Sequence, residues 1–551
     1  MSILYLDDIS LPGHGNVSGA FWSQDRRILA VTSIFRLLTE PPARAAYGVQ
    51  KLRYRVSLYR PPSRRPIAVF DDAVLPIKDL AFHPTKTVLA LGAGSYDGGF
   101  FFKGQLVLWD WAESRSQSLR AIPEILRLRF TDGGDDIEAI VRPWDDGCGE
   151  GQVEAIDTFY RVSLMGVFTQ KWDDRTERVV RDQIDGQKPL TSREAAVIPC
   201  FGQRTENTVE AIERAFGLDS FQQRSPIWDI ALMDSDAVSI VHDDCLLDVF
   251  NRQGERRGSF KGRGHGVQIF RTHEPLVHIA HFDENAADWS TACNTVLLKL
   301  HDAQLHEVVS LAGRYAFSRA QSGSVLGRCD RSFQTERESA EADVILSSNL
   351  REMTKHDFGH YDVFNHYIRV DAAPYLFFVQ GTPPSSHEAK YLCTVTVSGL
   401  VERLWPLLRD AGDQASHAME CCFCYIHDHH GPGMIVSGRH YNSSPVAPYS
   451  GFIYRRNLDG RELWRHATKA SAASIKVVPN SSVVMVAFLD GDFAMLQGDN
   501  GAITRWQAFR PDGDSSIIIS LDVDNTHVAF GTIDGRCGVT PLSDFVREAF
   551  G

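Results

Sequence analysis

The sequence has no long hydrophobic run and no excess of positive charge. No stretch reaches the roughly 18 consecutive apolar residues that suggest a membrane-spanning helix, so we expect no membrane segment. The formal net charge is -13, from 57 basic and 70 acidic side chains. Direct nucleic-acid binding depends on a basic surface that neutralises phosphates. We therefore expect neither a membrane nor a nucleic acid among the partners.

The chain also lacks the signature of secretion. Its first residues, MSILYLDDISLPG, contain no basic segment and include Asp7 and Asp8, whereas a signal peptide begins with positive charge. We therefore expect a cytoplasmic protein, a compartment in which cysteines stay reduced. The 10 cysteines are accordingly interpreted as free thiols, most of them buried as small apolar side chains.

Common catalytic and cofactor-binding motifs are missing as well. The sequence contains no GxSxG elbow, no HExxH motif, no GxxxxGK[ST] phosphate loop and no GxGxxG after a predicted strand. Asp522-x-Asp524-Asn525 begins like a calcium loop but lacks the glycine and the distal glutamate, which favours a simple turn. The sequence therefore predicts no catalytic residue and no cofactor.

One cluster of cysteines and histidines resembles a metal site at first reading. Cys421-Cys422-Phe423-Cys424 is followed by a histidine-rich segment at 427–430. In a strand, however, Cys422 and Cys424 point to one face and Cys421 to the other. No second CxxC or HxxxH lies nearby to complete a tetrahedral set. The pattern favours a buried strand that runs into a polar turn, and we predict no metal site.

Residues 77–113 carry the pattern around which the rest of the chain is organised. Apolar and polar residues alternate through Leu80 and Phe82, and a polar turn at 83–86 leads into a second apolar segment at 88–91. After a glycine-rich loop, a third segment ends at Trp109-Asp110. Short strands joined in this way are typical of one blade of a β-propeller.

The same pattern recurs on both sides, which gives about ten candidate units. The unit that begins at 125–130 is expected to close with a fourth strand at 167–172. Weaker units start near Arg314 and Tyr367. The last two units each contain an Asp-Gly pair, the residues that tight hairpin turns prefer, at Asp490-Gly491 and Asp534-Gly535.

Residues 173–225 interrupt the pattern with a charged, partly helical segment. Asn207 can cap a helix, Glu210 stands at the capping-box position, Ile212 and Phe216 share a face, and Gly217 follows as a C-cap. We therefore divide the chain into 1–172 (three blades and an N-terminal strand), an insertion at 173–225, and 226–551 (the remaining blades).

The N-terminal residues 3–9 form a predicted strand that has no blade of its own. This strand can supply the fourth strand of the last blade, which would close the ring and remove an exposed sheet edge. The predicted fold class is therefore all-β: a β-propeller of four-stranded antiparallel blades, with about 8–10 candidate blades, closed by the N-terminal strand and carrying one partly helical insertion.

These motifs resemble the WD-repeat β-propeller superfamily in a divergent form. Trp109-Asp110 ends a third strand as in WD repeats, and Gly13-His14 and Gly264-His265 precede first strands. The structural aspartate that WD repeats place in a turn matches Asp97, Asp243, Asp490 and Asp534. What the resemblance implies is a rigid, mostly non-catalytic platform for protein partners, although a fold does not by itself specify a function.

Long connections recur at one position in the units. The turns between first and second strands stay short, whereas the connections between second and third strands are long, as at 143–158, 283–294 and 440–450. Insertions at one position of a repeat mark one face, often the binding face. Aromatic and acidic residues in these loops are the predicted partner-binding residues: Trp144, Asp145, Asp146, Asp288, Trp289, His440 and Tyr441.

Three functions remain open at this stage. The first is a non-catalytic protein-interaction scaffold or sensor subunit whose partner has a basic or mixed-charge surface, because aromatic residues anchor a partner and acidic residues steer it. The second is a propeller hydrolase or lyase with its site at the mouth of the central channel. The third is a carbohydrate-binding module that uses exposed tryptophans.

Overall fold

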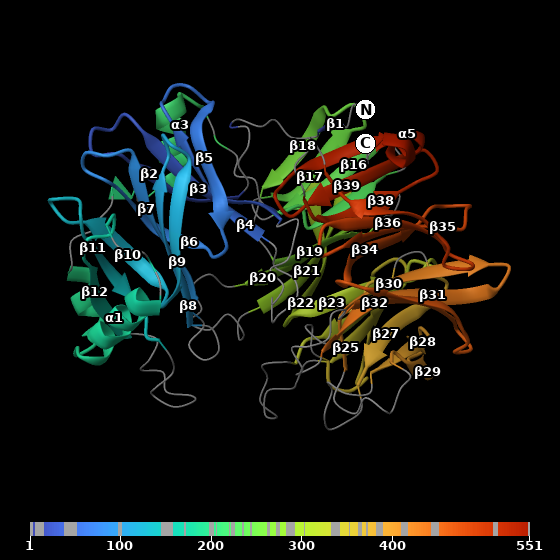
Figure 1. Ribbon diagram of the computed structural model, residues 1–551. Coiled ribbons are helices and arrows are strands. Elements are labelled where there is room, and N and C mark those ends of the chain that lie inside the picture. Colours follow the sequence, from blue (N-terminus) through green and yellow to red (C-terminus); the bar gives the residue numbers. More distant parts are fainter. Residues whose placement is uncertain are drawn as a thin grey trace. The chain divides into compact units, whose positions relative to one another are not determined.

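Two compact units make up the chain in the computed structural model (Figure 1). The small unit comprises Ile9–Leu38 and Lys51–Arg224, and the large unit comprises Met1–Asp8, Thr39–Gln50 and Ser225–Gly551. The structure describes residues 4–5, 11, 16–37, 52–96, 102–144, 158–169, 172, 174–197, 203–204, 207–219, 221, 226–233, 236–242, 245–261, 265–270, 276–282, 293–301, 304–331, 342–351, 353–361, 366–370, 373–381, 390–408, 417–441, 451–510 and 516–548.

The described residues of the small unit form three antiparallel sheets. The first contains, in order across it, β14 (Gln203–Arg204), β2 (Asn16–Trp22), β3 (Leu29–Leu37), β4 (Leu52–Tyr59) and β5 (Pro66–Ala73). The second contains β6 (Ile77–Phe82), β7 (Val88–Tyr96), β8 (Phe102–Asp110) and β9 (Arg115–Ile122). The third contains β10 (Ile125–Phe130), β11 (Ile137–Val141), β12 (Thr158–Leu164) and β13 (Leu190–Thr191).

The large unit contains seven antiparallel sheets within its described residues. The first three are β15 (Asp229–Leu232), β16 (Ala237–His242), β17 (Cys245–Asn251) and β18 (Arg256–Lys261); β19 (His265–Phe270), β20 (Leu276–Phe282), β21 (Cys293–His301) and β22 (Gln304–Ala312); and β23 (Tyr315–Arg319), β24 (Val325–Cys329), β25 (Asp343–Leu346) and β26 (Met353–His356). The fourth has three strands, β27 (Leu376–Gln380), β28 (Tyr391–Val395) and β29 (Val401–Pro406).

The last three sheets of the large unit again have four strands each. They are β30 (His417–Asp428), β31 (Gly431–Tyr441), β32 (Gly451–Asn457) and β33 (Glu462–Thr468); β34 (Ala472–Val477), β35 (Val483–Phe488), β36 (Asp492–Gln497) and β37 (Ile503–Ala508); and β38 (Ile518–Val523), β39 (His527–Thr532), β40 (Cys537–Pro541) and β1 (Leu4–Tyr5). Strand β1 pairs antiparallel with β40, Leu4 opposite Val539. The prediction that the N-terminal segment completes the last sheet is therefore confirmed.

Neighbouring sheets of the large unit share hydrophobic clusters. In β35 every residue after the first is buried, which shows that both faces of its sheet are covered. The outer strand β22, in contrast, is mostly exposed. One cluster joins sheets β23–β26, β27–β29 and β30–β33, and further clusters join each following pair of sheets. The outer strands β22, β26 and β37 are therefore more exposed than inner strands such as β24 and β35.

The last sheet of the large unit also packs against the first. Ile230 and Val238 of sheet β15–β18 share a cluster with Ala529 and Val539 of the final sheet. The carboxylate of Asp522 accepts a hydrogen bond of 2.7 Å from the backbone N–H of Leu232. Segments almost 300 residues apart in sequence are thus joined by apolar contact and by a buried hydrogen bond.

Four helices are described besides the strands: α1 (Asp174–Asp185), α2 (Ser192–Val197), α3 (Thr208–Phe216) and α5 (Leu542–Glu548). In α3 the Asn207 side chain accepts from the Glu210 N–H, and Gly217 ends the helix with φ 62°. The predicted caps are therefore confirmed. Within the described residues no helix is both long and apolar enough to cross a membrane.

Trp109 and Asp110, the pair that carried the sequence resemblance, have structural roles in the small unit. The Trp109 ring is buried and lies 5.5 Å from the ring of Phe70. The Asp110 carboxylate accepts a hydrogen bond of 2.9 Å from the Thr87 hydroxyl and one of 3.1 Å from the Ala112 N–H. This pair therefore anchors the end of β8 and the turn that follows it.

Two sequence expectations are wrong in detail. Residues 166–169 form a turn, closed by a 2.9 Å bond from the Thr169 N–H to the Gly166 carbonyl, and it is β13 that pairs with β12 as the fourth strand. In the unit expected to begin near Tyr367, the described strands are β27, β28 and β29, and the earliest of them starts at Leu376. Residues 366–370 form no strand, and the side chains of Tyr367 and Arg369 bond to Gln268 and Asp229 of other sheets.

Position 134 requires a glycine, both because of its backbone conformation and because of the neighbouring His83 ring. It has φ 77°, and a Cβ added there would lie 2.5 Å from Nε2 of His83. The His83 ring cannot move away easily, because its Nδ1 accepts hydrogen bonds from the Thr85 and Lys86 N–H groups at 3.0 and 2.8 Å. Burial lowers the pKa of His83, as does the nearby Lys86 charge, so the ring is neutral here.

Gly134→Ala is expected to destabilise the small unit by about 1–3 kcal/mol, because positive φ and overpacking against His83 combine. The adjacent Gly133→Ala is the matched control, since no described atom lies within 4 Å of a Cβ at that position. Urea unfolding followed by tryptophan fluorescence measures both. Equal stability losses in the two variants would contradict the assigned role of Gly134.

Candidate functional site

The structure describes only some of the predicted partner-binding residues. Asp145, Asp146, Asp288 and Trp289 lie outside the described residues. Trp144, in the small unit, is half-buried; it packs on the cluster that joins the second and third sheets, and the Arg181 guanidinium of α1 lies 4.8 Å from its ring centre. This tryptophan therefore contributes to the packing of its own unit.

His440 and Tyr441 stand at the end of β31 in the large unit. The half-buried His440 ring lies 5.1 Å from the ring of Phe452 on the neighbouring strand. Tyr441 pairs with His417 in the ladder between β30 and β31. These two residues therefore mark the end of their sheet from which the long connection to β32 departs.

The cysteine cluster lies in β30, as its strand pattern predicted. Burial raises the pKa of the Cys422 thiol to about 12, so it stays protonated and is a poor nucleophile. Among the described residues, no three His, Cys, Asp or Glu side chains are grouped so that they could hold a metal ion.

Several carboxylates that a hydrolase could use are instead bonded to arginines. The Arg455 guanidinium lowers the pKa of Asp428 to about 2, and Arg465 and Arg456 lower that of Glu462 to about 2. Arg456 itself is fully buried and donates to Glu462 at 2.9 Å. These acids are ionised and held in ion pairs, which suits a structural role better than proton transfer.

A buried polar centre joins three segments of the large unit. The Asp229 carboxylate accepts hydrogen bonds from the Ile269 N–H at 2.7 Å and from Arg369 Nη1 at 2.5 Å, and Arg369 Nη2 donates to the Ile269 carbonyl at 2.5 Å. Burial raises the pKa of Asp229, and the Arg369 charge opposes that rise. These donors and acceptors satisfy one another, so the centre joins β15, β19 and residues 366–370.

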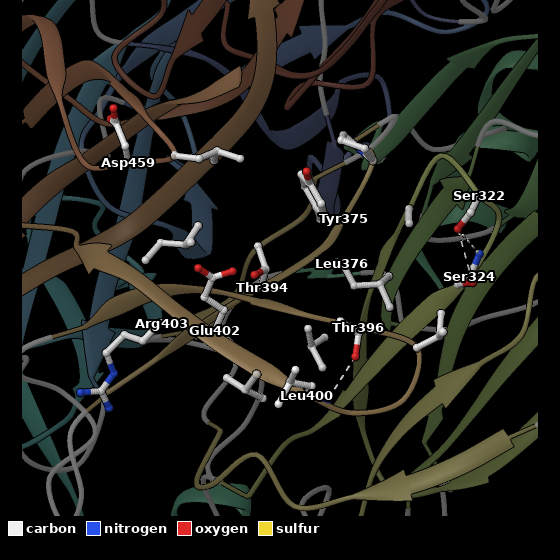
Figure 2. A pocket seen from close by; sticks show the side chains of 17 residues that line it. Ser322, Ser324, Tyr375, Leu376, Thr394, Thr396, Leu400, Glu402, Arg403 and Asp459 are labelled. Atoms are coloured by element: carbon white, nitrogen blue, oxygen red, sulfur yellow. Dashed lines mark hydrogen bonds between the residues drawn. The ribbon is translucent and has the colours of Figure 1, made fainter. Parts of the chain in front are cut away.

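A groove of about 890 Å³ lies in the described part of the large unit. Its walls come from the turn between β23 and β24, the segment that leads into β27, the hairpin between β28 and β29, and the turn between β32 and β33 (Figure 2). In the sheet β30–β33, the β32–β33 turn lies at the end opposite to the β31–β32 connection, because neighbouring strands run antiparallel. The groove is therefore at the other end of the sheets from His440 and Tyr441.

Large apolar side chains line this groove and remain exposed. The exposed fractions are 71% for Leu400, 62% for Val397, 49% for Tyr375 and 40% for Val401. Single exposed apolar residues are ordinary, but a group of them around one concave surface is typical of an interaction site.

The backbone of the β28–β29 hairpin explains why Val397 and Leu400 point outward. The Thr396 hydroxyl accepts a hydrogen bond of 3.1 Å from the Leu400 N–H, and Gly399 has φ 85°. These two features close a tight turn in which the aliphatic residues cannot reach the core. The turn therefore displays apolar side chains where polar residues are usual.

The polar groups of the groove are mainly acidic and hydroxylic. Glu402 lies directly opposite Thr394 in the ladder, and the two side chains project to the same side (Figure 2). Asp459 enters from the β32–β33 turn. Arg403 projects away from the labelled carboxylates, and its guanidinium lies 4.5 Å from the centre of the Tyr391 ring.

The sequence held one signal for this site, and it was missed. The segment Val397-Ser398-Gly399-Leu400-Val401 places three aliphatic residues in and beside a tight turn, where their side chains do not pack in the hydrophobic core. The long connections drew attention to the opposite end of the sheets. The remaining walls of the groove are too far apart in sequence to be grouped without the structure.

Comparison with known proteins adds no family for this chain. No family model matches the sequence, and no curated protein matches it at a significant level.

Proposed function

We propose that the seven described sheets of the large unit form one β-propeller, a divergent relative of WD-repeat propellers. Support comes from the shared clusters between successive sheets and from the packing of the last sheet on the first. Seven blades lie within the usual range of about 4–8. The sequence contains about ten candidate units, which is more than one ring usually holds. Three of the sheets belong to the small unit, so the proposed ring contains the other seven.

The function we propose is that of a non-catalytic, cytoplasmic scaffold or sensor subunit that binds another protein. The observation that carries this proposal is the groove whose exposed apolar side chains include Leu400, Val397 and Tyr375. A concave apolar surface with acidic residues among its walls suits a partner of basic or mixed charge. The ion pairs that hold Asp428 and Glu462 favour this function over a hydrolase or lyase.

The test is affinity purification from the native host with the wild type and a Tyr375→Ser/Leu400→Ser variant. A partner that depends on the groove is expected to fall by about tenfold or more in the variant, since buried aromatic and aliphatic anchors dominate binding energy. Because Leu400 is mostly exposed and Tyr375 about half exposed, the variant should lose no more than about 1 kcal/mol of stability.

Ile503→Ser is the matched control, because Ile503 is 48% exposed on β37 and lies outside the groove. It should capture the same proteins as the wild type. A variant that replaces Trp144, Asp145 and Trp289 tests the long-loop residues in the same assay. If the Tyr375→Ser/Leu400→Ser variant retains every protein that the wild type captures, the groove is not the binding site.

A further inference from the structure

The groove has a charge pattern that defines its occupant more closely. Glu402 and Asp459 bring two carboxylates to its walls, and neither forms an ion pair with a described residue. Among the described residues, the Arg461 N–H donates a hydrogen bond of 2.9 Å to the Asp459 carboxylate. A positive charge on an occupant of this groove would therefore be attracted by both carboxylates.

The cation already in the wall does not neutralise these acids. The Arg403 guanidinium stacks on Tyr391 and points away from Glu402, as alternation along β29 requires for consecutive residues (Figure 2). With a chain charge of -13, the long-range field also favours a cationic partner over an anionic one.

The apolar part of the groove requires aliphatic or aromatic side chains beside that charge. Leu400 and Val397 expose most of their surface in one hairpin, and Tyr375 exposes about half of its own from the segment before β27. A polar ligand such as a sugar would bury these aliphatic groups without satisfying its hydroxyls. Peptide side chains of the Leu, Val or Ile type match them instead.

The hydroxyl groups along the groove favour an extended rather than a helical backbone. Ser322, Thr394 and Thr396 lie along its length from sheets β23–β26 and β27–β29 (Figure 2). A helix satisfies its own N–H and C=O groups, whereas an extended segment needs external partners for them. A hydroxyl has one donor and two acceptor sites. Ser322 and Thr396 each use two of these within their own turns, so each keeps one site for a bound main chain.

We propose that this groove binds an extended segment of a partner protein in which a Lys or Arg is flanked by aliphatic residues. The cation lies beside Glu402 on the β29 wall of the groove, and the aliphatic side chains cover Leu400, Val397 and Tyr375. This inference rests on the proposed protein-binding function and adds to it the chemistry of the bound segment.

The test uses three pools of fluorescein-labelled nine-residue peptides, measured by fluorescence anisotropy with the full chain. All pools alternate Leu, Val or Ile with one polar residue, which is Lys in the first pool, Gln in the second and Glu in the third. We expect the Lys pool to bind at least about tenfold more tightly than the other two, and its binding to weaken with salt because the charges are exposed.

Glu402→Gln/Asp459→Asn should remove this preference, so that the Lys and Gln pools bind alike. Glu255→Gln is the control, since Glu255 is a surface acid outside the groove whose change leaves the apolar walls and both carboxylates intact. Equal binding of the Lys and Gln pools to the wild type would overturn the cation requirement while leaving groove-dependent protein capture in place.

Two other results would overturn the inference in different ways. If no pool binds but groove-dependent capture of a folded protein persists, the occupant is not an extended segment, and the proposed function survives. If sedimentation velocity shows a wild-type dimer that Leu400→Asp dissociates, the groove is occupied by a second copy of this chain. Failure of both peptide binding and groove-dependent capture would remove the proposed function itself.

Discussion

Asp428→Ala is expected to lower the free energy of unfolding of the large unit by about 3–5 kcal/mol, the cost of breaking a buried ion pair by removing one partner. Asp428 ends β30 and bonds to Arg455 of β32 through two contacts of 2.5 and 2.7 Å. The Arg455 side chain is 0% exposed. Without the carboxylate, its charge would remain buried with only carbonyl partners, among them Gly498 at 2.8 Å.

The matched variant removes both charges. Asp428→Ala/Arg455→Met replaces the buried guanidinium with an apolar side chain of similar length, so the double variant should lose less stability than Asp428→Ala alone. Urea unfolding of the wild type, both single variants and the double variant measures the coupling. If the double variant loses the sum of the two single losses, the residues are not coupled and the ion pair is not the source of stability.

The same pair gives a pH dependence with a defined sign. Arg455 holds the pKa of Asp428 at about 2 in the folded protein, below its ordinary value of 3.8. A carboxyl with a depressed folded pKa stabilises the protein above its unfolded pKa, and that contribution is lost as pH falls toward the folded pKa. The stability difference between wild type and Asp428→Asn should therefore shrink between about pH 4 and about pH 2.

The features that the sequence predicted well are determined by neighbouring residues. Helix α3 begins at Thr208 and ends before Gly217 because Asn207 and Gly217 satisfy backbone groups within one turn. The two Asp-Gly hairpins have Gly491 at φ 86° and Gly535 at φ 79°, which explains the preference for glycine there. Such local chemistry can be read from a few adjacent residues.

One long-range pairing was also predictable, because the rest of the sheet left a single gap. The last three strands form a sheet whose outer edge is unpaired within the C-terminal segment, and the N-terminal segment has apolar alternation but no neighbours of its own. Strand β1 fills that edge opposite Val539. In contrast, β14 pairs with β2 through only two residues, Gln203 and Arg204, which is too short a pattern to recognise.

The grouping of sheets into units depends on contacts that local patterns do not encode. Ile230 packs with Ala529 because two sheets stack, and nothing in either strand specifies that neighbour. The groove has the same origin: Ser322, Leu400 and Leu458 meet only when three sheets lie side by side. Sequence periodicity therefore predicted the strands, but neither the division into units nor the walls of the groove.

Asp229→Ala is the second variant for which we expect a large effect, a loss of about 3–5 kcal/mol. It would remove the acceptor of the Ile269 N–H and the partner of Arg369, a side chain that is 20% exposed. Asp229→Asn is the matched control: its amide oxygen can still accept from Ile269, so it should lose less stability. Thermal unfolding compares the two variants.

Hydrogen exchange separates this explanation from a general loss of stability. Arg369 belongs to residues 366–370, whose Ile368 and Val370 are buried in the cluster shared with sheets β27–β29 and β30–β33. Because Arg369 also donates to the Ile269 carbonyl, loss of Asp229 should free both segments together. Faster amide exchange is expected at Ile269, Ile368 and Val370 in Asp229→Ala, with β35 unchanged under the same native conditions. Uniform acceleration that includes β35 would mean that Asp229 supports global stability without holding residues 366–370 against β15 and β19.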